Sequence, residues 1–343
     1  METDILGPPY ERQTLDLGHD EEGPVVATLV RRRAPEPTGR AVLSVPGWSD
    51  YFFQTHAADH FVAAGFDFYA IDLRKYGRSL RSHQTPNFCH RLDEYFPDLD
   101  EAARIIRVED RHDRLLVAAH STGGLTAALW AHQRRGTGTV DALFLNSPFF
   151  DLNLPALLRV PARITAVRLA RRQPYAVLRR PPATAYGHSL HAAHRGEWSY
   201  DLAWKPVGGF PIRFGWLAAV HAGHRRLHAG LSIDVPVLVG CSTRSYRALQ
   251  WHALAHRADA VLDVADIVRW APRLGGHVTV LRVDGGMHDL TLSAAPVRAR
   301  LFSELSRWSA AYVAGAPPEI PAPVPPPVGT PPTAGAAVSA DPG

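Results

Sequence analysis

A serine lies between a strand-like and a helix-like segment of this sequence. The apolar run at 115–118 is followed by Ala-His-Ser-Thr-Gly at 119–123 and then by a helical pattern from Gly124. A serine on such a sharp turn exposes its Oγ at the edge of a sheet, and the helix N-terminus favours developing negative charge. The spacing therefore predicts that Ser121 is a nucleophile. The plainer alternative is a Ser-Thr-Gly turn that only begins a helix.

A serine nucleophile needs a histidine base, and a carboxylate must orient that base. In folds built on a strand-turn-helix serine, the base follows the nucleophile and the acid in the chain. Of the 18 histidines, His288 follows the last predicted strand, in a loop that would return to the same sheet edge. His252, His256 and His277 lack this placement and are expected on helices or at the surface. His288 is therefore the predicted base.

The acid is harder to assign, because the segment directly after the strand-like run 235–239 contains no carboxylate. The next acids along the chain are Asp259, Asp263 and Asp266. Asp263 stands where a helix should begin, which is the position of an N-cap, and Asp266 would then lie in the first turn. Asp259 precedes that helix in a loop and is the preferred acid, with Asp263 kept as the alternative.

Acyl transfer also needs N–H donors for the oxyanion, usually one after the nucleophile and one from a loop after an earlier strand. The backbone of Thr122 supplies the first donor. The loop at 45–51 contains Pro46-Gly47, a tight turn after a strand, and would present the N–H of Trp48. The alternative is a plain turn with Trp48 in the core.

These residues need a scaffold, and the hydrophobic pattern predicts one. Runs at 13–17 and 25–30 flank a turn-rich segment and predict an antiparallel hairpin. Strand-like and helical segments then alternate, which is typical of a parallel sheet with crossover helices. The expected strands are 41–45, 66–71, 114–118, 142–145, 235–239 and 278–283, and the expected helices lie near 55–64, 99–108, 124–134, 263–270 and 295–313.

The composition excludes several classes of protein. With 343 residues, 46% hydrophobic and 20% charged, the chain is neither disordered nor collagen-like, and two cysteines are too few for a disulfide framework. The first residues resemble no secretory signal and no long apolar run follows, so a cytoplasmic location is expected. Ten prolines in 317–343 predict an extended tail.

Taken together, these motifs resemble those of the α/β-hydrolase superfamily, and within it the monoacylglycerol lipase and serine aminopeptidase-like branch, over residues 10–315. Pro46 stands in place of the branch's histidine and Ala119 in place of its first glycine, and about 18 residues (241–258) are inserted before the acid. The segments that carry the resemblance are Pro46-Gly47-Trp48, Ile71–Ser79, Ala119–Gly123, Ala258–Asp263 and Gly286-Met287-His288.

The resemblance implies an α/β-hydrolase fold, a mostly parallel twisted sheet with crossover helices and an inserted helical cap. The expected divisions are a core at 1–150 and 235–315, a cap at 151–234 and a tail at 316–343. The implied activity is hydrolysis of acylglycerols, lysophospholipids or small esters, with the catalytic residues Ser121, Asp259 and His288 and no cofactor. Acyl transfer, N-terminal peptide cleavage or a catalytically silent ligand-binding protein remain alternatives.

The segment 151–234 holds twelve Lys and Arg against four Asp and Glu, a net charge of +8. A helix at 161–172, with Pro161 in its first turn, would place Val160, Ile164 and Val167 on one face. This face is expected to cover the active site; weak contact with an anionic membrane or a phosphate is the alternative. No nucleic-acid motif and no protein partner is inferred.

Two groups of residues in this segment could have a function or could only be structural. The aromatic residues could line an acyl pocket or fill a small core: Trp198, Tyr200, Trp204, Phe210, Phe214 and Trp216. The histidines have spacings that could bind zinc, but no patterned acid or cysteine accompanies them, so no metal site is expected: His188, His191, His194, His221, His224 and His228.

Overall fold

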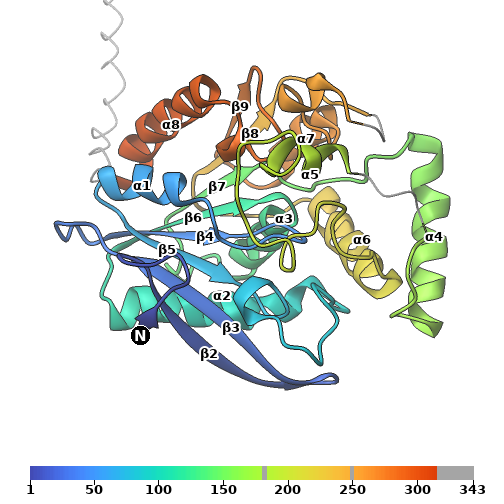
Figure 1. Ribbon diagram of the computed structural model, residues 1–343, viewed down its shortest axis with the longest axis horizontal. Helices are drawn as coiled ribbons and strands as arrows, with labels where there is room; N and C mark the ends of the chain where they lie inside the picture. The colour runs from blue at the N-terminus through green and yellow to red at the C-terminus, as the bar shows by residue number, and fades with distance from the viewer. Residues whose placement is uncertain (180–183, 248–250, 315–343) are drawn as a thin grey trace, which may run out of the picture.

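The computed structural model describes residues 1–179, 184–247 and 251–314. Their strands form one nine-stranded sheet in the order β1-β2-β3-β5-β4-β6-β7-β8-β9 (Figure 1). The strands from β5 to β9 along this order run parallel, and β1, β2 and β3 add an antiparallel edge. The strands are β1 Glu2–Thr3, β2 Glu11–Asp20, β3 Gly23–Arg32, β4 Arg40–Val45, β5 Asp67–Asp72, β6 Arg114–His120, β7 Ala142–Asn146, β8 Val237–Ser242 and β9 Val278–Val283.

The central strands are apolar on both faces because helices cover both sides of the sheet. One face packs against α2 (Phe96–Arg104) and α3 (Ser121–Gln133), and the other against α1 (Thr55–Ala63) and α8 (Ala295–Ser309). The remaining helix of the core, α7, spans Val264–Trp270. This two-sided arrangement confirms the predicted fold class.

Helices that the sequence placed near 99–108 and 124–134 begin earlier than expected. Helix α2 begins at Phe96 and is followed by a wider turn at Ile105–Glu109, and α3 begins at Ser121 itself. The glycines after Ser121 weakened the helical pattern there, but the tight packing of this turn requires them, as shown below.

The described part of the segment between β7 and β8 forms three helices, α4 (Ala156–Arg172), α5 (Ala185–Leu190) and α6 (Phe214–Ala229). The predicted start of the first of these is wrong, because Pro161 lies inside α4. Arg159 holds the added turn by ion pairs with Asp151 and Asp266. These contacts join residues distant in sequence, so local propensity could not predict them.

The apolar face of α4 also differs from expectation. Val160 is 54% exposed and Ile164 44% exposed, and no described side chain of α4 lines the cavity beside Ser121 that is described below. Helix α4 packs on α6 at the margin of the molecule (Figure 1). The expectation that this face covers the active site is therefore wrong.

Within the described residues, no helix has the length and apolar character needed to cross a membrane. The proline-rich tail predicted at 316–343 lies outside the described residues.

Candidate active site

Ser121 lies at the junction of β6 and α3 with a backbone φ of +51°. This left-handed conformation is unfavourable for a residue with a side chain and persists only where the surroundings enforce it. The enforcing contact is close: a Cβ added to Gly123 would lie 2.2 Å from the carbonyl oxygen of Pro46. Ala119, in place of the usual glycine, is accommodated in the core at 1% exposure.

The structure brings Ser121, His288 and Asp259 together. His288 Nε2 lies 3.0 Å from Ser121 Oγ, and His288 Nδ1 lies 2.9 Å from Asp259 Oδ2. All three side chains are buried, with Asp259 at 0% and His288 at 2% exposure. A carboxylate on one ring nitrogen and a hydroxyl on the other is the geometry that lets a histidine take the serine proton.

Asp259 reaches this position in spite of the preceding insertion because its backbone pairs with the segment that follows β8. Its N–H donates to Arg244 O at 2.9 Å, and its carbonyl accepts from Tyr246 N at 2.7 Å. Its Oδ1 accepts the N–H groups of Val261 and Leu262, each at 2.8 Å. These bonds orient the other oxygen, Oδ2, toward His288.

The two other candidate acids are engaged elsewhere. Asp263 caps α7 by accepting the N–H of Ala265 at 3.1 Å and also pairs with Arg247. Asp266 pairs with Arg159 of the cap at 2.6 Å. The structure brings neither of them to His288.

The predicted oxyanion donors meet next to the serine. A Cβ on Gly47 would lie 3.0 Å from Ser121 Cβ, so this loop lies directly against Ser121. The backbone N–H of Trp48 donates to Thr122 Oγ1 at 3.2 Å. Trp48, Ser121, Thr122 and His288 all line one cavity of about 290 Å³.

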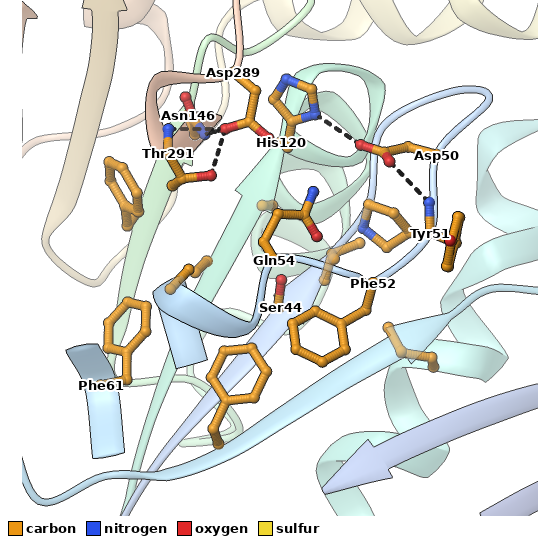
Figure 2. A pocket seen from close by; sticks show the side chains of 18 of the residues that line it. Ser44, Asp50, Tyr51, Phe52, Gln54, Phe61, His120, Asn146, Asp289 and Thr291 are labelled. Carbon is orange, nitrogen blue, oxygen red and sulfur yellow. Dashed lines mark hydrogen bonds and ion pairs between the residues drawn. The ribbon is translucent and has the colours of Figure 1, made fainter. Parts of the chain in front are cut away.

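The sequence analysis missed the groups that hold the histidine loop. Asn146 Nδ2 donates to Asp289 Oδ1 at 2.7 Å, and Asn146 Oδ1 accepts the N–H of Leu290 at 3.1 Å. Thr291 donates twice to the same Asp289 oxygen, as Figure 2 shows. Asn146 ends the parallel strand β7, and a polar residue at such a strand end was the available signal.

A buried ionic cluster around Asp50 was not predicted from the sequence; Figure 2 shows its contact with His120. Asp50 Oδ1 lies 2.8 Å from Lys205 Nζ, and Asp50 Oδ2 lies 3.5 Å from His120 Nδ1. Burial alone would raise the pKa of Asp50, but the positive charge of Lys205 and the contact with His120 lower it below its ordinary value.

In the described chain, Asp50, His120 and Asp289 form the one group with atoms close enough to share a metal ion, within 4.8 Å of one another. Lys205 already provides a cation for Asp50, and Asn146 and Thr291 supply donors to Asp289. The side chains present therefore engage both carboxylates of the cluster, whereas neither ring nitrogen of His120 has a hydrogen-bond partner among the described residues. The cap histidines form no such group in the described chain; His224 and His228 bond to the carbonyl oxygens of Phe149 and Phe150 instead.

The aromatic residues of the cap divide between the two roles left open. Tyr200 and Trp216 line the 290 Å³ cavity. Trp204 packs edge-on against Tyr51 at 5.2 Å between ring centroids, and Trp198 stacks on His56 at 4.5 Å.

The sequence is similar to that of a known protein family. A model of the serine aminopeptidase S33 family matches residues 36–244. The chain belongs to this family. The search of curated proteins found no match.

Solved structures of similar fold include a soluble variant of monoglyceride lipase from Saccharomyces cerevisiae in complex with a substrate analogue. It is 15% identical, with 88% of this chain and 96% of the lipase covered and a TM-score of 0.65. Another is the monoacylglycerol lipase of Paleococcus ferrophilus, at 17% identity, 87% and 97% coverage and a TM-score of 0.58. At these identities the likeness concerns the fold, which is that of an α/β hydrolase.

Proposed function

We propose that this hydrolase cleaves carboxylic esters through an acyl-enzyme on Ser121. The observation that carries the proposal is the continuous hydrogen-bonded chain from Ser121 Oγ through His288 to Asp259, which opens on a cavity. Ser121 Oγ attacks the ester carbonyl while His288 Nε2 accepts the serine proton and later donates it to the leaving alcohol. Water, activated by the same histidine, then releases the acid.

The charge that develops on the carbonyl oxygen is held by the backbone N–H groups of Trp48 and Thr122. In the free enzyme the Trp48 N–H is bonded to Thr122 Oγ1, so substrate binding exchanges one acceptor for another. This exchange favours the transition state if the oxyanion is the stronger acceptor, as expected for a charged oxygen.

The cavity supports an ester with one acyl chain or a small aryl or alkyl acyl group. Its walls include Phe149, Leu152, Ile212, Trp216 and Leu217, which suit hydrocarbon. Monoacylglycerols, lysophospholipids and small acyl esters all fit this description, and the finer choice among them is part of the proposal.

Cleavage of an N-terminal peptide bond and acyl transfer use the same triad, but the cavity favours neither of them as strongly as it favours ester hydrolysis. An aminopeptidase needs a carboxylate for the substrate ammonium. Among the described residues that line the cavity, Asp50 is the one acid, and Lys205 already neutralises it. We therefore place ester hydrolysis ahead of peptide cleavage, with acyl transfer to an alcohol or amine as the second candidate.

We also propose weak contact between α4 and an anionic membrane surface or a phosphate. Exposed apolar side chains, led by Leu157 at 91%, lie on the same helix as Arg163, Arg168, Arg171 and Arg172. Exposed apolar side chains and arginines on one helix supply the hydrophobic and the electrostatic contributions to binding at an anionic lipid surface. The two buried free cysteines fit the reducing, cytoplasmic location expected from the sequence.

The test is a panel of p-nitrophenyl esters and monoacylglycerols of increasing chain length, assayed with and without added alcohol or amine acceptors. Hydrolysis that is lost in Ser121→Ala is the expected result. Product that forms mainly on the acceptor would favour acyl transfer, and no turnover of any ester by the folded protein would contradict the proposal.

A further inference from the structure

The cap segment 201–210 contacts every residue of the loop Trp48 to Tyr51, here called the oxyanion loop. Asp201 N donates to the Tyr51 hydroxyl at 2.7 Å, and Phe210 N donates to Ser49 Oγ at 3.1 Å. Lys205 pairs with Asp50 at 2.8 Å. A Cβ on Gly209 would lie 2.8 Å from the ring of Trp48, so the backbone there lies against the indole. One cap segment thus contacts the four consecutive residues 48–51.

The oxyanion loop needs such support. Ser49 has a backbone φ of +57°, a conformation that a residue with a side chain holds only when its surroundings determine it. Its neighbour Trp48 carries the N–H proposed above as an oxyanion donor, and small displacements of such a donor weaken catalysis strongly. The contacts of Ser49 and Asp50 with the cap therefore bear directly on where that N–H points.

The Lys205–Asp50 pair is the strongest of these contacts. Lys205 is 6% exposed and Asp50 2%, so solvent screens their attraction little. The ammonium also lies 5.7 Å from the ring centroids of Phe53 and Tyr200, in a largely aromatic surrounding. The pair joins two separate parts of the chain, because Lys205 belongs to the cap and Asp50 to the core.

The same segment also faces the substrate. Lys205, Pro206, Val207 and Gly209 line the active-site cavity. An acyl group in the cavity therefore touches the segment that holds the oxyanion loop on its other side. This arrangement gives the cap a part in catalysis in addition to closing the cavity.

We infer that cap segment 201–210, fixed by the Lys205–Asp50 pair, positions the Trp48 N–H for the oxyanion. Lys205 is then a positioning residue that acts through Asp50 and the loop. The inference rests on the proposed serine hydrolase function. If the inference holds, the cap contributes to kcat. A cap that only covers the cavity would instead affect substrate binding and therefore KM.

The test compares Lys205→Met with Lys75→Met, the matched control. Lys75 is the other lysine of the chain, is 2% exposed and pairs with Asp20 at 2.6 Å and Glu22 at 2.5 Å, but does not line the cavity. Both variants lose a buried ammonium group, with two carboxylate partners at Lys75 and one at Lys205, so general destabilisation should be at least as large in the control. Lys205→Arg keeps the charge and should recover part of the activity.

The assay uses p-nitrophenyl acetate, whose short acyl group makes few contacts in the cavity. For Lys205→Met we expect kcat to fall about 10- to 100-fold with KM changed less than about threefold, because an oxyanion interaction is made in the transition state. The affinity for a trifluoromethyl ketone, whose adduct carries an oxyanion, should fall by a similar factor. Lys75→Met should keep kcat within about twofold.

A second readout is the rate at which a fluorophosphonate labels Ser121, since its phosphoryl oxygen would occupy the same N–H groups. This rate reports on the loop even if the wild type hydrolyses no ester, so failure of the proposed substrate class and failure of the inference are distinguishable. Unchanged kcat and labelling rate in Lys205→Met, with only KM raised, would overturn the inference. Equal losses in Lys205→Met and Lys75→Met would overturn it as well.

Discussion

The loops at the sheet edge and helix α4 of the cap bury their side chains very differently. At the sheet edge, Asp259 is 0% and His288 2% exposed, and each makes a defined hydrogen bond. On α4, Leu157 is 91% and Val160 54% exposed. The ladder of parallel strands fixes the first region, while ion pairs such as Arg159 with Asp266 hold the second at a few points. Rigid positioning therefore belongs to the carboxyl ends of the strands, and substitutions on the exposed face of α4 should leave the site unchanged.

The largest effect is expected when the two candidate acids, Asp259 and Asp263, are replaced by asparagine one at a time. Asp259→Asn should lower kcat/KM by at least about 100-fold, because the histidine loses both its orientation and the charge that stabilises it when protonated. Initial rates on a p-nitrophenyl ester give the measurement.

Asp263→Asn is the matched control for that exchange. Asparagine still caps a helix, so this variant removes the charge beside Arg247 and little else. Its activity should stay within about threefold of wild type. A damaging Asp263→Asn together with a harmless Asp259→Asn would reverse the assignment.

This contrast between regions explains what the sequence could predict. The alternation of apolar strands and helices predicted the core, and the strand-turn-helix serine motif and the loop after the last strand predicted the pair Ser121 and His288 that the structure brings together. Asp259 was harder, because its position depends on backbone pairing with Arg244 across an insertion. Lys205, Asp50 and Asn146 were missed, since the contacts that define them join residues far apart in sequence. The start of α4 was wrong for the same reason.

A smaller effect concerns the acid stability of the cap. Burial, together with Arg163, lowers the pKa of His221 to about 4, and burial lowers that of His224 to about 3. Both values lie below the ~6.5 of an unfolded chain, so the unfolded state binds more protons in this window. The stabilisation is complete above about pH 7.5 and is lost progressively as pH falls through ~6.5 toward the folded-state pKa values.

Urea unfolding at pH 7, 6 and 5 measures that loss. In His221→Leu the dependence of unfolding free energy on pH should be shallower, because one of the two titrating groups is gone. A wild-type stability that is flat or rises from pH 7 to pH 5 would contradict the pKa directions.

The smallest effect is expected on the exposed face of α4. Leu157→Ser with Val160→Ser should change the unfolding free energy by no more than about 0.5 kcal/mol, as is usual for exposed positions. Turnover of a soluble ester should be unchanged. Sedimentation with anionic vesicles should decrease, and equal sedimentation with anionic and neutral vesicles by the wild type would remove the membrane contact.

The central claim is that Ser121, at the carboxyl end of the central strand β6, is an activated serine. The most direct measurement incubates the purified protein with a fluorophosphonate probe and locates the modified residue by mass spectrometry, with Ser121→Ala as control. The account predicts labelling of Ser121 in the wild type and none at that site in the variant. A folded wild type that the probe leaves unmodified would contradict it and would favour a ligand-binding protein that retains the fold without the activity.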